Sequence, residues 1–140
     1  MNTPIEETLV LIKPDGVARN LTGEILRRIE AKGYSLVDMK LVQADRTLLA
    51  SHYAEHEGKP FYEPLVEFME SGPIVAFRVA GNRVIEGFRA LAGTTDPTTA
   101  APGTIRGDLG RDWGHKVQQN LVHGSDSPES ASRELALWFN

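Results

Sequence analysis

The sequence predicts an α+β fold whose elements follow the order βαββαβ, as in ferredoxin-like folds. Short apolar runs rich in β-branched residues, such as residues 8–12 (TLVLI) and 74–79 (IVAFRV), are typical of strands. Residues 22–32 place apolar side chains at helical spacing, which is typical of an amphipathic helix. Glycine and proline separate such segments. We therefore expect an antiparallel sheet with helices on one face, an added helical pair, and a long loop before the last strand.

The first elements follow directly from these patterns. Residues 8–12 predict a buried strand that ends in a turn at KPDG. Residues 22–32 predict a helix, because apolar residues repeat on one face and Gly33 follows as a stop signal. Residues 34–42 predict a strand with an irregularity near Leu36, where the alternation of apolar residues changes phase.

The rest of the chain continues the same order. Residues 94–103 (TTDPTTAAPG) have no periodicity and predict a long loop, and loops of this kind often carry function. The last helix is expected at residues 128–138, with Asp126 or Ser127 as its N-cap and Pro128 in its first turn. The other predicted elements are helices at residues 47–56, 61–71 and 83–92, and strands at residues 74–79 and 120–123.

Length and composition limit the possible classes of protein. The 140 residues suit one domain covering residues 1–140. A formal net charge of −4 argues against a dedicated nucleic-acid binder, and the absence of cysteine excludes disulfides and thiolate chemistry. The N-terminal segment lacks the pattern of a signal peptide, and no apolar run is long enough to cross a membrane. We expect a cytoplasmic protein with no membrane partner.

One of the four histidines, His123, stands at a junction between the last strand and the last helix. Gly124 follows it and allows a ligand or another backbone to approach closely. The start of the next helix favours anions, so an imidazole here suits nucleophilic attack on phosphate. A packed histidine bonded to a carbonyl is an equal alternative on local sequence alone. Glu134, in the last helix, is a candidate partner for one ring nitrogen.

Several cationic and hydroxyl side chains suggest a polyphosphate site. Arg89 and Arg106 flank the long loop, and an arginine in such a position suits bidentate phosphate contacts. Lys13 stands at the end of the first strand, and Thr95 offers a hydroxyl. Each alone is more often a surface residue. The chain contains neither a P-loop nor the glycine-rich loop of protein kinases, so phosphate would be bound in another way.

A competing pattern is HYAEH, residues 52–56, which matches the H-x-x-E-H motif of some zinc peptidases. His52 and His56 would share one face of a helix at this spacing. The pattern needs a third ligand and arises readily by chance. An exposed helix with two polar histidines is therefore the stronger interpretation.

Taken together, five segments resemble the nucleoside diphosphate kinases over residues 7–139: TLVLIKPDGV, HYAEHEGKPFY, SGPIVAF, GTTDPTTAAPGTIRGD and NLVHGSDSPESASRELALWF. The NxxHGSD stretch matches the family signature. The resemblance implies transfer of the γ-phosphate of a nucleoside triphosphate, typically ATP, to a nucleoside diphosphate, which maintains the pools of ribo- and deoxyribonucleotides. It implies a ping-pong mechanism through a phosphohistidine. A non-catalytic nucleotide-binding regulator on the same fold is the alternative.

The resemblance also implies roles for individual residues. His123 would be phosphorylated at Nδ1, Glu134 would orient its ring, and Ser125 would bond the glutamate. Tyr53 matches the tyrosine beside the catalytic histidine. The residues that match nucleotide-binding positions are Lys13 and Asn120 for the ribose, with Lys13 also near the phosphates, Arg89, Thr95 and Arg106 for the phosphates, and Phe61 for the base.

Further implications concern the cofactor and the assembly. Mg²⁺ would bridge the phosphates with few or no direct protein ligands. The family forms homo-oligomers, and the loop at residues 94–103 favours a hexamer over a tetramer or a dimer. The segment at residues 109–119 is longer than expected for the family. Val117 is a candidate base contact within it, and Trp113 and His115 are expected to be surface or interface residues.

Overall fold

The computed structural model describes residues 5–113 and 119–140. Its sheet is antiparallel throughout and has the strand order β2-β3-β1-β4. Two long central strands thus lie between an outer strand, β2, and a short strand, β4, that carries His123. The α+β class and the βαββαβ order are confirmed. The strands are β1 (Ile5–Ile12), β2 (Ser35–Val42), β3 (Ile74–Asn82) and β4 (Val122–Gly124).

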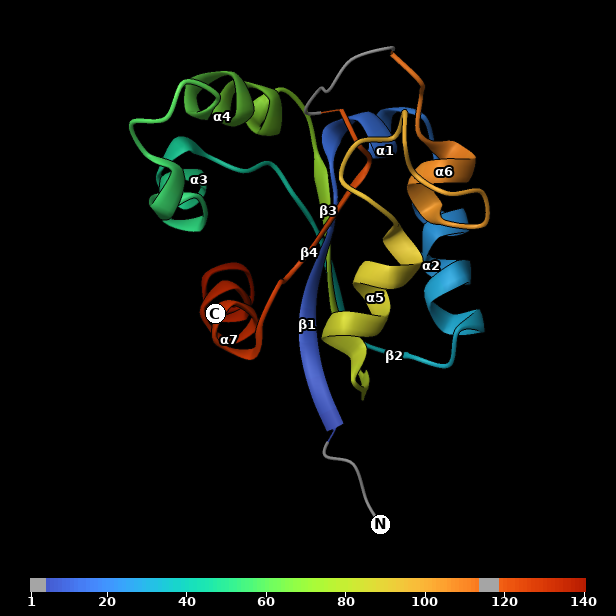
Figure 1. Ribbon diagram of the computed structural model, residues 1–140. Helices are drawn as coiled ribbons and strands as arrows, with labels where there is room; N and C mark the ends of the chain where they lie inside the picture. The colour runs from blue at the N-terminus through green and yellow to red at the C-terminus, as the bar shows by residue number, and fades with distance from the viewer. Residues whose placement is uncertain (1–4, 114–118) are drawn as a thin grey trace.

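Helices cover both faces of the sheet, so the expectation of a single covered face is wrong (Figure 1). The reason lies in β1. Its residues Leu9 and Leu11 pack into one hydrophobic cluster and Val10 and Ile12 into another, and all four are fully buried. A strand buried on both faces has a continuous apolar run, as TLVLI does. One face carries α2 (Thr22–Ala31) and α5 (Val84–Ala92), and the other carries α3 (Arg46–His52), α4 (Tyr62–Glu70) and α7 (Pro128–Trp138).

Strand β2 differs from the others because its side chains are mostly exposed. Val37 is 51% exposed, Met39 49% and Leu41 70%, although all three are apolar. The register of β2 against β3 shifts between Leu36 and Asp38, which confirms the predicted irregularity. The edge strand therefore has one apolar row, formed by Val37, Met39 and Leu41, that the rest of the described chain leaves exposed.

Short elements account for the other differences from the predictions. The expected turn at KPDG is a short helix, α1 (Pro14–Ala18), which begins with proline as a first helical turn allows. The helix expected at residues 47–56 ends early and continues as the 3₁₀ turn η1 (Ala54–His56). A helix that was not predicted, α6 (Ile105–Leu109), follows the long loop, and its five residues are too few to show a helical period.

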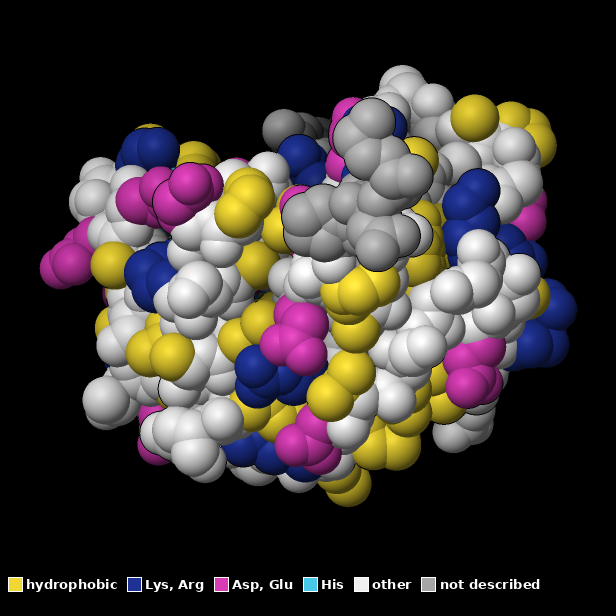
Figure 2. Space-filling view, turned by 90° about the horizontal axis from the view of Figure 1, so that it is seen from below, with side chains coloured by type: hydrophobic (Ala, Val, Ile, Leu, Met, Phe, Trp, Pro, Cys, Tyr) yellow, Lys and Arg dark blue, Asp and Glu magenta, His cyan; other side chains and the backbone are white. Residues whose placement is uncertain are grey.

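The last helix matches the prediction. It covers Pro128–Trp138, and the Ser127 hydroxyl caps it by accepting a hydrogen bond from the Ser130 N–H. None of the helices in the described ranges is long and apolar enough to cross a bilayer. On the face seen in Figure 2, basic and acidic side chains are interspersed with apolar ones.

Candidate active site

A pocket of about 720 Å³ opens beside β4. It collects Lys13, at the junction of β1 and α1, and residues from α3, η1, α5, the long loop, α6, β4 and α7, and so brings together segments from most of the chain. Eight of the ten predicted site residues line it: Lys13, Tyr53, Arg89, Thr95, Arg106, Asn120, His123 and Glu134. Ser125 lies fully buried behind Glu134. Phe61 is 43% exposed and meets the pocket wall through the ring of His56, at 5.2 Å between centroids.

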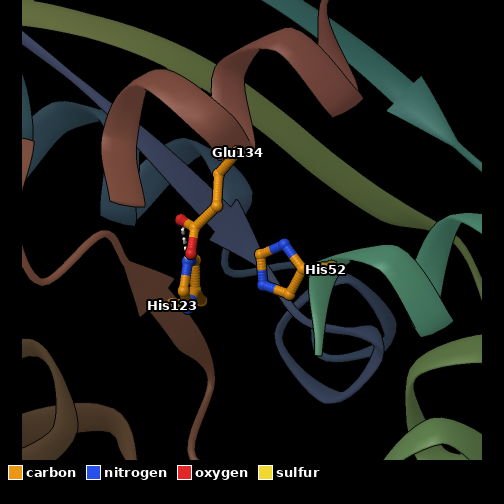
Figure 3. A group of neighbouring side chains, drawn as sticks. All are labelled: His52, His123 and Glu134. Carbon is orange, nitrogen blue, oxygen red and sulfur yellow. Dashed lines mark hydrogen bonds and ion pairs between the residues drawn. The ribbon is translucent and has the colours of Figure 1, made fainter. Parts of the chain in front are cut away.

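His123 and Glu134 form a hydrogen-bonded pair. The Glu134 Oε1 atom lies 2.8 Å from His123 Nε2 and also accepts the Ser125 hydroxyl at 2.7 Å (Figure 3). The Ser125 oxygen in turn accepts the Leu9 N–H, so β1 anchors the far end of this chain of bonds. The pair engages Nε2 of His123, which leaves Nδ1 as the nitrogen available for another partner.

The charge on Glu134 is favoured by its neighbours. Burial alone would raise the pKa of this carboxyl, but the hydrogen bonds from His123 and Ser125 and the electrostatic attraction of His123 outweigh it, so its pKa is lowered. A carboxylate bonded to Nε2 keeps the proton on that nitrogen and gives the ring one orientation. The arrangement therefore presents an unprotonated Nδ1 while the ring is neutral.

Lys13 and Asn120 form a second pair beside the histidine. The Lys13 ammonium donates to Asn120 Oδ1 at 2.8 Å, and the Asn120 amide donates to the carbonyl of Thr95 at 2.9 Å. This series of contacts ties the end of β1 to the long loop. Burial lowers the pKa of Lys13 to about 8, assisted by the charge of Arg106 and opposed by that of Asp15.

Arg106 donates to three backbone carbonyls. Its guanidinium reaches Asn120 at 3.0 Å, Gly93 at 2.8 Å and Val122 at 2.6 Å, and so joins α6, the end of α5 and β4. Five N–H groups are available on a guanidinium, so two remain for a ligand. Burial lowers the pKa of Arg106 to about 10, with a further contribution from the charge of Arg89.

The backbone just before His123 is strained and held on both sides. Leu121 has a φ of 75°, a left-handed conformation that is unfavourable for a branched side chain. Its carbonyl accepts the Lys13 N–H at 2.8 Å, and its N–H donates to the Asp15 carboxylate at 3.2 Å. The sequence analysis did not predict a role for Asp15, although this residue belongs to the same KPDG motif as Lys13 and the motif could have indicated it.

The zinc-peptidase pattern does not form as such. Helix α3 ends at His52, and His56 lies in the following 3₁₀ turn, so the two histidines do not share a helix face. Within the described part of the chain, one group of three potential metal ligands occurs, and it comprises His52, His123 and Glu134. The preferred interpretation, an exposed helix with two polar histidines, is wrong for His52, which is 3% exposed. The candidate base contact Val117 and the candidate interface residue His115 lie outside the described residues, and Trp113 is 41% exposed.

Comparisons with known proteins agree with the resemblance. A family model described as nucleoside diphosphate kinase matches residues 6–140. The nucleoside diphosphate kinase of Mycobacterium avium is 62% identical over 135 residues, covering 96% of both chains, and that of Streptomyces avermitilis is 60% identical with the same coverage. The structure of the enzyme from Halobacterium salinarum in complex with CDP superposes with a TM-score of 0.90 at 47% identity, covering 98% of this chain and 89% of that one.

Proposed function

Because the chain belongs to the nucleoside diphosphate kinase family, it transfers phosphate from a nucleoside triphosphate to a nucleoside diphosphate, and we propose that His123 carries the phosphoryl group between them. The observation that supports this most directly is the bond between His123 Nε2 and the buried Glu134 carboxylate. It leaves Nδ1 as the nucleophilic nitrogen, in a pocket that also contains Lys13, Arg89 and Arg106.

In the first half-reaction, the Nδ1 lone pair forms a bond to the γ-phosphorus. The bond from that phosphorus to the bridging oxygen breaks, and its electron pair leaves with the nucleoside diphosphate. The Nε2 proton stays on the ring and is shared with Glu134, whose negative charge stabilises the positive ring that forms. In the second half-reaction an acceptor diphosphate attacks the same phosphorus, and the ring leaves with its lone pair restored. This sequence is a ping-pong mechanism.

Binding roles follow the charges around the pocket. Arg89, Arg106 and Lys13 neutralise phosphate oxygens, and Thr95 donates a hydroxyl. Asn120 and Lys13 bind the ribose, and Phe61 at the rim stacks on the base. The Halobacterium salinarum relative binds CDP, and stacking accepts any base because each has a π-face. Tyr53, buried beside His52, forms part of the wall, and burial raises the pKa of its phenol, so it stays neutral.

Mg²⁺ fits this site as an ion coordinated by the phosphates of the nucleotide and not by protein side chains. It prefers oxygen ligands, whereas the described cluster of potential metal ligands contains two imidazoles and a carboxylate already bonded to His123 and Ser125. The ion would bridge phosphate oxygens and neutralise their charge. The residues that approach those phosphates from the protein side are the cations Lys13, Arg89 and Arg106.

We further propose that the 140 residues act as one catalytic domain in a cytoplasmic homo-oligomer, with a hexamer favoured. The exposed apolar row of β2, formed by Val37, Met39 and Leu41, supports association because such a row is an unfavourable surface for an isolated chain. The loop at residues 94–103 is a second candidate contact.

The decisive experiment is incubation with ATP labelled on its γ-phosphate. The wild-type chain should acquire an acid-labile, base-stable phosphate and pass it to an unlike diphosphate. His123→Ala should lose the label and at least about a thousandfold of the turnover, while His56→Ala, which changes another histidine of the pocket lining, should keep the label. A wild-type chain that binds nucleotide without acquiring the label would support the non-catalytic alternative.

A further inference from the structure

His52 is a buried histidine that the phosphotransfer scheme leaves without a role. It is the last residue of α3 and is 3% exposed. Its ring lies between that of His123, at 4.7 Å between centroids, and that of Trp138, at 5.7 Å. Figure 3 shows His52 beside the bonded pair of His123 and Glu134. The ring of His52 therefore contacts the ring of His123 directly, and Glu134 lies nearby, because one potential ligand atom of each of the three side chains lies within 4.8 Å of the others.

The contact with Trp138 fixes which nitrogen of His52 carries the proton. The indole Nε1–H lies 3.0 Å from His52 Nδ1 and can only donate, so Nδ1 must hold a lone pair. Burial, assisted by the charge of His123, lowers the pKa of His52 to about 3, so the ring is neutral at physiological pH. A neutral imidazole with its lone pair on Nδ1 has its proton on Nε2.

That Nε2–H is directed at His123. The two rings meet at 73°, an edge-to-face arrangement. In Figure 3 the ring of His123 is seen nearly edge-on, and one nitrogen of His52 is turned toward it while the other is turned away, toward α7. Since Nδ1 is bonded to Trp138 on α7, the nitrogen turned toward His123 is Nε2.

The same tautomer argues against a resident metal ion. One ligand atom from each of His52, His123 and Glu134 lies within 4.8 Å of the others, as in a set of metal ligands. A metal needs a lone pair from each ligand, whereas His52 Nε2 presents a proton. If that proton moved to Nδ1, two N–H groups would face each other, and the hydrogen bond from the Trp138 indole would be lost. We therefore interpret His52 as a residue that acts on His123 and not as a metal ligand.

We propose that His52 is a positioning residue, held by Trp138, that points an N–H at the ring face of His123 and so favours the uncharged ring over the phosphorylated one. The face of a neutral imidazole is electron-rich and attracts an N–H. The phosphorylated ring that keeps its Nε2 proton is positive, and the N–H dipole then opposes it. The phosphohistidine is thereby kept from becoming too stable to pass its phosphate on. This inference rests on His123 being the phosphorylated residue.

The tautomer can be tested without any phosphate. ¹⁵N NMR of the chain labelled at histidine should show His52 with Nδ1 unprotonated and Nε2 protonated. In Trp138→Phe, which keeps an aromatic ring but removes the donor, both tautomers should be populated. A proton on Nδ1 of His52 in the wild-type chain would overturn the proposal.

The effect on the reaction can be measured as an equilibrium constant. The fraction of phosphorylated protein is determined over a series of ATP:ADP ratios and normalised to its maximum at high ATP, so that inactive protein does not contribute. His52→Phe should shift this constant toward the phosphoenzyme by about two- to fivefold, the size expected for one N–H···π contact. Trp138→Phe should shift it in the same direction by less, and it serves as the second variant if His52→Phe does not fold.

The control is Phe77→Leu, a change in the core on the other face of the sheet that should lower stability and leave the constant unchanged. An unchanged or decreased constant in both His52→Phe and Trp138→Phe refutes the role of His52 while leaving phosphorylation of His123 intact. Absence of a phosphoenzyme in the wild-type chain would instead refute the proposed function.

Discussion

Lys13 is a cation that the fold has moved away from water into the lining of the pocket, where we propose that it binds the nucleotide. Its pKa of about 8 means that the free protein holds this charge incompletely at mildly alkaline pH. Between pH 8 and 10.5 the unfolded chain binds more protons at Lys13 than the folded chain does, so the free energy of unfolding contributed by this residue increases with pH in that range. If Lys13 binds the nucleotide as proposed, binding depends on the charged form, so the affinity for nucleotide should decrease as the pH rises.

We predict that the KM for ATP increases as the pH rises above about 8, by up to about tenfold per pH unit. The physical cause is deprotonation of Lys13 in the free enzyme. The KM for ATP can be measured by steady-state kinetics from about pH 7 to about pH 9.5. Lys13→Arg keeps its charge over this range, so its KM, whatever its absolute value, should lose most of the increase. An equal increase in both proteins would assign the pH dependence to another group.

Strand β4 is an element of only three residues, and its position depends on close packing as much as on hydrogen bonds. Gly124 follows His123 directly and lies opposite Val10 of β1. A Cβ placed on Gly124 would come within 2.6 Å of the buried Phe88 ring of α5. Glycine therefore lets the strand that carries His123 pack closely against α5.

Gly124→Ala should lower the free energy of unfolding by about 1–3 kcal/mol, since either the ring or the strand must move. Because His123 is its neighbour, the rate of phosphoenzyme formation should fall as well. Denaturant titration and a rapid-quench measurement check the two effects. Gly23→Ala on α2 is the matched control: its Cβ meets nothing within 4 Å, and it should leave the rate unchanged and alter stability by no more than about 1 kcal/mol, in the favourable direction. A Gly124→Ala protein as stable as wild type would contradict the packing argument.

Local signals explain which elements could be predicted from sequence. Helix α7 was predicted at its observed bounds because a serine cap and a proline mark its start and a helical period continues from there. Helix α6 was missed because its five residues are too few to show a helical period, although the Thr104 hydroxyl caps its start by accepting the Gly107 N–H. Its contacts with distant segments, where Arg106 donates to backbone carbonyls, leave no mark in the sequence. The candidate site was predicted residue by residue from motifs. The place of His52 could not be, because its partner Trp138 is 86 positions away.

At the scale of the whole molecule, the apolar edge of β2 is the most exposed hydrophobic feature of the described strands. We predict that Leu41→Lys reduces the mass of the assembly in solution, because a charge in this row would have to be buried on association. Sedimentation or light scattering at a fixed protein concentration measures the mass. Glu67→Lys, at an exposed position on α4, is the control for a change of charge alone. An unchanged mass in Leu41→Lys would place the subunit contacts elsewhere.

The pairing of the first and last parts of the chain has a consequence for protein synthesis. Lys13 and Asn120 are 107 positions apart, and His123 and Glu134 come later still. A ribosome releases these segments in order, so the nascent chain exposes β1, apolar on both faces, well before β4 and α7 emerge to pack against it. Until then the chain has neither the proposed nucleophile, His123, nor the Glu134 carboxylate bonded to it. We therefore expect nascent chains that lack β4 and α7 to be inert toward ATP, and phosphotransfer to begin only after both segments have folded onto β1.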